Sequence, residues 1–197
     1  MSIINVVGAK IWGGGEQYVY DICKQLQQRH RTAYILVDQS NEDMQSRYAQ
    51  VGHVITGNLY TLKGFLSVNA VAKQMKEKGI HTIVCHSGKY ILFCIALKQL
   101  TGAKLVFIKH NLVPGKTDIY HRWINAQVDA FVCVSKLVYD DLMTPAIKDT
   151  SKYHVVYNGI DPNRFQSFSD AVPMEYKVRT FGYSARITER KGLYLIL

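Results

Sequence analysis

Short apolar runs alternate with longer amphipathic stretches along the first 157 residues of this chain, and this alternation limits the folds available to it. In the stretch 16–29, for example, Val19, Ile22, Cys23 and Leu26 share one helical face. Alternation of this kind is typical of repeated strand–helix units, and it predicts an α/β fold with a parallel, doubly wound sheet. The expected strands are residues 3–9, 33–37, 53–55, 82–85, 105–109, 130–134 and 153–157, and the expected helices are 16–29, 62–78, 90–100, 118–126 and 136–143.

The pattern loosens after residue 157, where residues 158–173 have the polar composition of an interdomain linker. A new apolar run at 178–184 then predicts the first strand of a second domain. One strand and the start of a helix cannot bury both faces of a sheet, so we expect the second domain to be truncated here. The expected division is an N-terminal domain at 1–162, a linker at 163–176 and the start of the second domain at 177–197.

The chain carries 24 Lys and Arg against 15 Asp and Glu, and its net charge of +9 favours anionic partners. The basic residues are scattered and form no continuous run, so the sequence gives no support for nucleic-acid binding. Cys23, Cys85, Cys94 and Cys133 stand singly in apolar segments, which predicts buried free thiols and neither disulfides nor a zinc site. With no signal-like or spanning segment in the sequence, we expect a cytoplasmic protein.

Three consecutive glycines, Gly13, Gly14 and Gly15, follow the first expected strand and precede the first expected helix. Glycine adopts backbone conformations closed to other residues and lets a ligand approach the N–H groups at the positive end of a helix. The loop therefore predicts an anion site. It lacks the Gly-x-Gly-x-x-Gly register of dinucleotide sites, and Gly14 and Gly15 stand where a P-loop has Lys and Ser or Thr. A tight turn without a ligand is the alternative.

Four sequence phrases occur in a fixed order: GGGEQ at 13–17, VCVSK at 132–136, VVYNGID at 155–161 and GYSARITERKG at 182–192. Their order and spacing resemble those of glycosyltransferase family 4. The resemblance implies a GT-B fold, in which two Rossmann-like domains face each other across a cleft. It also implies a nucleotide-diphosphate sugar as the donor, no metal ion or other cofactor, and retention of the anomeric configuration.

The resemblance also implies roles for three side chains. Arg186 and Lys191 follow the expected strand 178–184, and an Arg fork with a Lys point charge suits a diphosphate. By resemblance they neutralise the departing diphosphate; a solvated surface turn is the alternative. His110 follows the expected strand 105–109 and resembles the histidine that faces the reacting sugar in the family. A purely structural hydrogen bond is the alternative for His110.

Five further residues are candidates for lining the same cleft: His86, Ser87, Asn111, Ser135 and Asn158. His86 is equally consistent with a structural histidine behind the site. Ser135 opens an expected helix and is also a natural N-cap. Asn158 and Gly159 are expected to form a turn toward the linker, because both residue types tolerate a positive φ.

The sequence thus predicts a retaining, hexosyltransferase-type enzyme that acts on a glycan, lipid-linked or lipopolysaccharide-type acceptor. Trp12 and Tyr18 beside the first loop, together with the excess positive charge, suggest an anionic lipid-linked or polysaccharide acceptor. Peripheral contact with the anionic inner face of the plasma membrane is a further expectation. A GT-B epimerase or phosphorylase and a non-catalytic phosphate-binding or regulatory module stay open. The family's ribose-binding glutamate would lie beyond Leu197, so we expect the 197-residue chain by itself to be inactive and to bind a donor weakly.

Overall fold

The computed structural model of the chain describes residues 2–59, 64–143, 147 and 149–162. Residues 1–159 form one compact unit. The expected strand 178–184 and the two cations Arg186 and Lys191 lie outside the described residues. The domain boundaries expected at 162 and 176 therefore stay a prediction.

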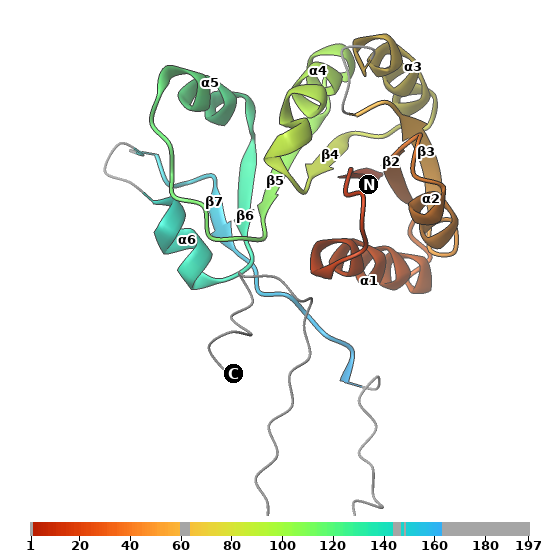
Figure 1. Ribbon diagram of the computed structural model, residues 1–197, viewed down its shortest axis with the longest axis horizontal. Coiled ribbons are helices and arrows are strands. Elements are labelled where there is room, and N and C mark those ends of the chain that lie inside the picture. The colour runs from red at the N-terminus through yellow and green to blue at the C-terminus, as the bar shows by residue number, and fades with distance from the viewer. Residues whose placement is uncertain (1, 60–63, 144–146, 148, 163–197) are drawn as a thin grey trace, which may run out of the picture. The chain divides into compact units, whose positions relative to one another are not determined.

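The centre of this unit is a seven-stranded sheet in which every neighbouring pair of strands is parallel. The strand order is β3-β2-β1-β4-β5-β6-β7, so β1 pairs with β2 on one side and with β4 on the other. This arrangement confirms the predicted doubly wound, Rossmann-like α/β fold (Figure 1). The strands are β1 (Ile3–Val7), β2 (Ala33–Asp38), β3 (His53–Gly57), β4 (Thr82–Cys85), β5 (Lys104–Lys109), β6 (Ala130–Cys133) and β7 (Tyr153–Val155).

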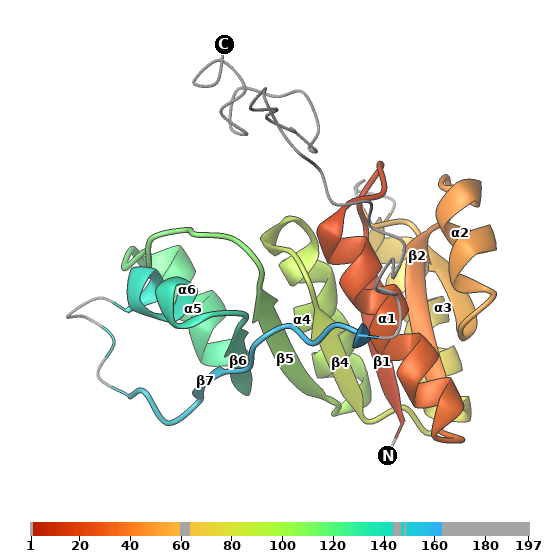
Figure 2. The same ribbon diagram turned by 90° about the horizontal axis from the view of Figure 1, so that it is seen from below.

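Helices cover both faces of the sheet, as a parallel sheet requires. One face is covered by α1 and α2 and the other by α3, α4 and α5, and Figure 2 shows α1 lying over β1 and β2. The helices are α1 (Gly14–Gln28), α2 (Glu42–Tyr48), α3 (Gly64–Glu77), α4 (Ile91–Thr101), α5 (Ile119–Gln127) and α6 (Lys136–Leu142), with a short 3-10 helix, η1 (Gly88–Tyr90), before α4.

Two hydrophobic cores lie on opposite faces of the sheet. The smaller core contains Val7 of β1 and Val19 of α1, and the larger contains Val6 of β1 and Met75 of α3. Successive residues of β1 thus belong to different cores, because side chains alternate across a strand. Burial on both faces explains why the strands are nearly continuous apolar runs in the sequence.

Helix α2 was not expected from the sequence. Its seven residues make about two turns and bury only Met44 and Tyr48, which is too short a stretch for a helical period to stand out. A local signal does exist: Asn41 accepts a hydrogen bond from the Met44 N–H at 3.2 Å and caps the helix. The acidic residues Glu42 and Asp43 lie in the first turn, where the helix dipole favours negative charge.

Helix α4 ends at a glycine that the backbone requires. Gly102 has a φ of 71°, in the left-handed region, and its N–H donates to the Lys98 carbonyl at 2.8 Å. A side chain at this position would strain the backbone, and glycine is the common solution at a helix C-terminus. None of the described helices has the length and apolar character needed to cross a membrane.

Asp129 joins three elements of the fold at the start of β6. Its carboxylate accepts hydrogen bonds from the Leu105 N–H of β5 at 2.8 Å and from Lys98 of α4 at 2.7 Å, and Lys104 lies at 3.4 Å. Burial alone would raise the pKa of Asp129, but these hydrogen bonds and the two ammonium groups lower it below its ordinary value. The carboxylate therefore stabilises the fold in its charged form.

We expect Asp129→Ala to lower the free energy of unfolding by about 1 to 3 kcal/mol, because Lys98 and the Leu105 N–H lose a charged partner. Since the folded-state pKa is lowered, this stabilisation is present above the ordinary Asp pKa of about 4 and is lost as the pH falls below it. Urea unfolding at pH 7 and at acid pH measures both effects. Glu77→Ala is the control, because that exposed side chain lies 3.9 Å from Lys73; an equal loss in both variants would contradict the assignment.

Candidate functional site

The candidate site lies where the sheet changes its direction of winding. From β1 the chain passes into α1 and on to β2, whereas from the neighbouring β4 it passes through η1 and α4 to β5 on the other side. The two connections leave the carboxyl ends of β1 and β4 in opposite directions, and ligands of doubly wound folds bind in the crevice that this leaves. The glycine loop follows β1, and His86 follows β4.

Two of the predicted residues contact each other at this point. His86 Nδ1 lies 3.0 Å from His110 Nε2, and the two rings are stacked with centroids 5.3 Å apart. On its other side, His86 Nε2 lies 3.1 Å from the side-chain oxygen of Asn5, a buried residue of β1. The hydrogen-bonded chain Asn5–His86–His110 thus joins three adjacent strands, β1, β4 and β5.

The chain of hydrogen bonds determines which ring nitrogens carry protons. Asn5 Nδ2 is directed at Cys23 Sγ, 3.7 Å away, which leaves the amide oxygen turned toward His86. An amide oxygen only accepts, so His86 Nε2 donates, and in a neutral ring His86 Nδ1 must then accept. His110 Nε2 is therefore the donor to His86, and Nδ1 of a neutral His110 is left as an acceptor.

Both rings are held neutral at physiological pH. Burial, and to a smaller extent the neighbouring His110, lowers the pKa of His86 to about 3. Burial also lowers the pKa of His110. A charged His86 would carry a second donor at Nδ1 in place of the acceptor and would break the chain, so the neutral form of His86 preserves the geometry.

The first turns of α1 lie beside the histidine pair. The ring of Tyr18 packs edge-on against His110, with centroids 5.1 Å apart, and against His86 at 6.1 Å. Gly13 caps α1 in an extended conformation with a φ of −155°, and neither Gly14 nor Gly15 has a positive φ. These three glycines therefore do not use the conformations closed to other residues. A Cβ at Gly14 or Gly15 would meet no atom of the described residues within 4 Å beyond its own helix, so the described part of the fold does not require glycine there.

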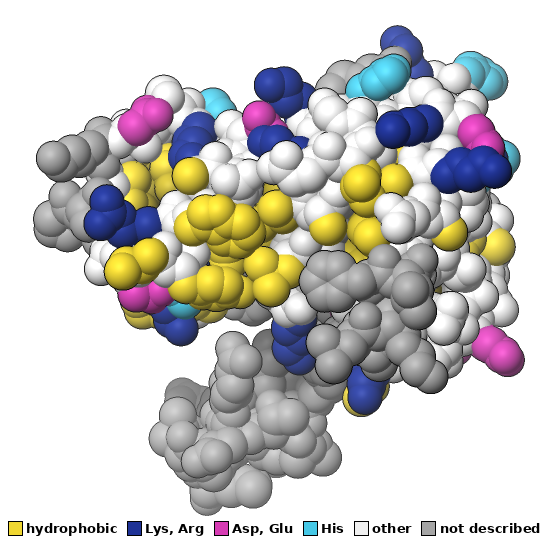
Figure 3. Space-filling model, turned by 90° about the horizontal axis from the view of Figure 1, so that it is seen from above, with side chains coloured by type: hydrophobic (Ala, Val, Ile, Leu, Met, Phe, Trp, Pro, Cys, Tyr) yellow, Lys and Arg dark blue, Asp and Glu magenta, His cyan; other side chains and the backbone are white. Residues whose placement is uncertain are grey.

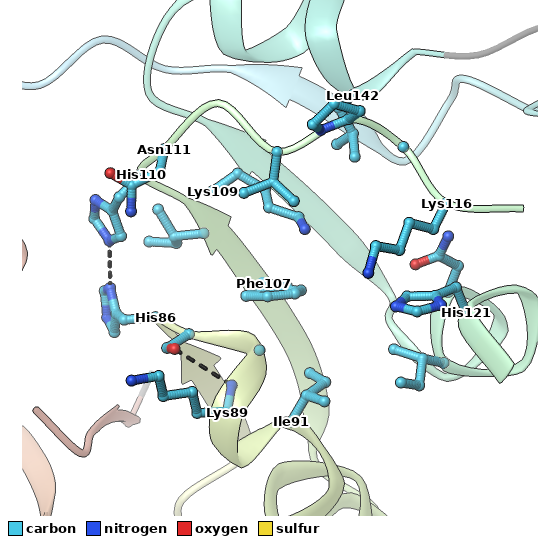
Figure 4. A pocket seen from close by; sticks show the side chains of 18 of the residues that line it. His86, Lys89, Ile91, Phe107, Lys109, His110, Asn111, Lys116, His121 and Leu142 are labelled. Atoms are coloured by element: carbon cyan, nitrogen blue, oxygen red, sulfur yellow. Dashed lines mark hydrogen bonds between the residues drawn. The ribbon is translucent and has the colours of Figure 1, made fainter. Parts of the chain in front are cut away.

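A cavity of about 340 Å³ opens beside the histidine pair, between the ends of β4 and β5 and the helix α5 (Figure 4). Four of the predicted residues, His86, Ser87, His110 and Asn111, line one side of it. A volume of this size is within the range of small-molecule sites. The remaining lining residues are Gly88, Lys89, Ile91, Phe107, Ile108, Lys109, Val113, Pro114, Gly115, Lys116, Tyr120, His121, Ile124, Asn125 and Leu142.

The other predicted site residues lie outside this cavity. Ser135 caps α6 by accepting a hydrogen bond from the Val138 N–H at 3.2 Å. This confirms the alternative interpretation of Ser135 as an N-cap. Asn158 is exposed in an irregular segment after β7. The turn expected there is wrong, because neither Asn158 nor Gly159 has a positive φ and no turn forms. Gly13, Gly14 and Gly15 stand at the start of α1, the helix whose Tyr18 contacts the two histidines, while Arg186 and Lys191 lie outside the described residues.

The structure adds site residues that the sequence did not indicate. Asn5 lies inside an apolar strand, and a polar residue at such a position is a signal that could have indicated it. Lys109 was assigned to a strand, and only the fold shows that it lines the cavity. Trp12 packs against Tyr48, with ring centroids 5.4 Å apart, and lies under the Arg47 guanidinium. Tyr18 is likewise engaged, against the two histidines.

Among the described residues, no three His, Cys, Asp or Glu side chains are grouped so as to hold a metal ion. The metal independence expected from the sequence is not tested by this and stays a prediction. The four cysteines are free and buried, as predicted.

Residues 12–164 match the family model described as Glycosyltransferase Family 4. Among curated protein sequences, none matches this chain significantly.

Several solved structures share the fold. A glycosyltransferase from Rickettsia africae has a TM-score of 0.70 and 19% identity, over 84% of this chain and 46% of its own. The Anabaena protein HepE in complex with UDP has a TM-score of 0.64 and 18% identity, over 83% of this chain and 45% of its own. MurG from Acinetobacter baumannii has a TM-score of 0.58 and 13% identity, over 84% of this chain and 49% of its own. The chain therefore spans about half the length of the structures that it matches.

We expect His86→Gln to make the protein less sensitive to acid. In the unchanged protein the unfolded chain binds a proton as the pH falls through about 6.5, whereas folded His86 does so only near its lowered pKa of about 3. Between pH 7 and 4.5 the unchanged protein should lose about 1 to 2 kcal/mol more of its unfolding free energy than His86→Gln, as measured by urea titration. His154→Gln alters an exposed histidine and should follow the unchanged protein. Parallel pH profiles for all three proteins would refute the assignment.

Proposed function

Because the chain belongs to glycosyltransferase family 4, we propose that it forms part of an enzyme that transfers a sugar from a nucleotide-diphosphate sugar to an acceptor. The proposed reaction retains the anomeric configuration, is of the hexosyltransferase type and needs no metal ion. The proposed acceptor is a glycan, a lipid-linked sugar or a lipopolysaccharide-type chain. In this proposal the described domain supplies the acceptor side, and the residues after the linker supply the donor side of a GT-B cleft.

The observation that carries the proposal is the position of His110. It stands at the carboxyl end of β5, beside the switch point, with Nε2 committed to His86 and Nδ1 left to accept a hydrogen bond. A neutral ring held in one orientation is suited to contact a hydroxyl of the donor sugar, and orienting a substrate is a large part of catalysis. His86 and Asn5 act through His110 and are positioning residues.

The donor diphosphate would be bound from two sides. Arg186 and Lys191 would neutralise it from the second domain, as the motif at 182–192 suggests. The N–H groups of the first turn of α1 would face it from the described domain, where the open space over Gly14 and Gly15 admits a close approach. Two cations and a helix terminus together offset the diphosphate charge, which is the role that a divalent ion has in other transferases.

A direct test is to supply UDP-glucose to the enzyme that carries the complete second domain, since the structural neighbour HepE was solved with UDP-glucose. We expect transfer with retention, read from the anomeric proton signal of the product by NMR. An inverted product would refute the retaining mechanism. A new epimer of the sugar, or a sugar phosphate formed with added phosphate, would instead favour the epimerase or the phosphorylase.

In the same enzyme, Gly15→Ala should leave the unfolding free energy unchanged or raise it by up to about 1 kcal/mol, because alanine favours the helix. It should nevertheless lower kcat/KM by about tenfold or more, since the methyl group displaces the donor phosphate. Gly102→Ala is the matched control and should destabilise the protein without changing kcat/KM of the folded enzyme. Full activity of Gly15→Ala would refute a phosphate site at this loop.

We also propose peripheral contact with an anionic membrane, through α5. Ile119 is 86% exposed, and Tyr120 and Trp123 are about half exposed on the same helix, with the exposed Arg122 beside them. Figure 3 shows hydrophobic side chains gathered on the side of the sheet where α3, α4 and α5 lie. Aromatic rings together with a cation are typical of helices that bind lipid headgroups.

Vesicles that contain anionic lipid should bind the protein at low salt, and Trp123→Ser should weaken the binding by about tenfold, measured by co-sedimentation. High salt should weaken it too, because screening reduces the electrostatic part. Leu137→Ser, at a residue of α6 that is 65% exposed, is the control and should bind as the unchanged protein does. Equal binding to neutral and anionic vesicles, or none to either, would refute the membrane contact.

A further inference from the structure

Among the described residues, the charged side chains that line the cavity beside His110 are all basic. Three lysines line it, Lys89 from η1, Lys109 from the end of β5 and Lys116 from the segment before α5, and its lining contains no Asp or Glu. Figure 4 shows Lys109 and Lys116 directed into the space between Phe107 and His121. Positive charge that converges from separate elements on one hollow raises the local concentration of anions.

Lys109 has no counter-charge within the described part of the chain. Its Nζ lies 4.6 Å from the centroid of the Phe107 ring, and no ion pair or hydrogen bond to it is present among the described residues. Burial lowers the pKa of Lys109, which shows that its surroundings disfavour the ammonium form. A half-buried ammonium group without an anion lowers the stability of the fold. A bound anion beside Lys109 would offset this cost.

Other basic residues of the domain do have acidic partners. Lys98 pairs with Asp129 and Lys136 pairs with Asp140, and neither lysine lines the cavity. His121 does line the cavity, and its Nδ1 lies 2.6 Å from Asp118. Lys116, like Lys109, forms no ion pair with a described residue.

The rest of the cavity wall is apolar. Ile91, Phe107, Ile124 and Leu142 are buried and form a surface against which a sugar ring or another non-polar group can pack. Asn125 and His121 add hydrogen-bonding groups at the α5 side. The site thus combines an apolar wall with two unpaired ammonium groups at one place and His110 at its edge.

We propose that this cavity binds the acceptor and that the acceptor carries an oxyanion, a carboxylate or a phosphate, which Lys109 and Lys116 bind. This inference rests on the proposed glycosyltransferase function and names the substrate class for its acceptor side. With the oxyanion on the two lysines and the sugar ring against Phe107 and Ile124, the rest of the acceptor extends toward His110. The hydroxyl that attacks the donor then lies at the end of the cavity that His86 and His110 line.

The 197-residue chain can be tested for binding without any donor. Titrations with glucuronate, glucose 6-phosphate and glucose, followed by amide NMR, separate a carboxylate, a phosphate and a neutral sugar on nearly the same ring. We expect at least one of the anionic sugars to bind about tenfold more tightly than glucose, since a charged hydrogen bond contributes that much. The shifted signals should include Gly115 and Ile124 of the cavity.

Lys109→Met keeps the length of the side chain and removes its charge, and it should abolish the preference for the anionic sugar while glucose binding is unchanged. Lys109→Arg should keep the preference. Lys116→Met, in an exposed segment, should weaken anion binding too and gives a second variant if Lys109→Met does not fold. Lys24→Met, at an exposed residue of α1 outside the cavity, is the matched control.

Three results would overturn the inference: equal affinity for the neutral and anionic sugars, no binding of either anionic sugar, or anion binding that neither Lys109→Met nor Lys116→Met weakens. Kinetics of the enzyme with its second domain separate this failure from failure of the proposed function. Transfer to neutral and anionic acceptors with equal kcat/KM would refute the charge requirement and would support the glycosyltransferase function. If anionic sugars bind but no sugar is transferred from any nucleotide sugar, the proposed function is refuted and the anion site is supported.

Discussion

The parallel pairing of β1 with β4 is the constraint on which the rest of the domain depends. Residues 3–6 of β1 pair with residues 82–85 of β4, although α1, β2, α2, β3 and α3 separate the two strands in the chain. Both strands end at the same edge of the sheet, and their connections then leave in opposite directions. The crevice between them needs no special residues, because right-handed crossovers on either side of the pair produce it. Asn5, His86 and His110 reach this edge through β1, β4 and β5, and Tyr18 reaches it through α1.

The polar chain from Asn5 to His110 shows how a buried side chain can set the chemistry of a partly exposed one. Asn5 is enclosed between β1 and α1, and its amide orients His86, which in turn orients His110. An apolar residue at position 5 would suit the strand equally well by its packing. The polar residue is tolerated because both ends of its amide have partners, which is the general condition for burying such a group. The apolar surroundings then keep the two imidazole rings neutral.

Charge is distributed unevenly over the domain. At the base of β5, Asp129 neutralises Lys98 and Lys104, and in α6 Asp140 neutralises Lys136. At the opposite end of β5, Lys109 points into a hollow with only an aromatic ring beside it. The excess of basic residues in the sequence is therefore partly compensated by local ion pairs. Lys109 and Lys116, which form no ion pair with a described residue, both line the cavity beside His110.

Local patterns in the sequence determined the elements of this fold. Strand β4 was predicted at its observed bounds, the alternating pattern predicted a parallel sheet covered on both faces, and Ser135 was identified as a helix cap, because each of these depends on residues close in the chain. Only the tertiary structure decided which side chains meet. The strand order brings Asn5 to His86 across 81 positions, places Tyr18 on His110, and turns Lys109 toward Lys116. The hydrophobic periodicity of a sequence carries no information on strand order or crossover direction. The packing of the whole domain therefore sets these contacts between distant residues.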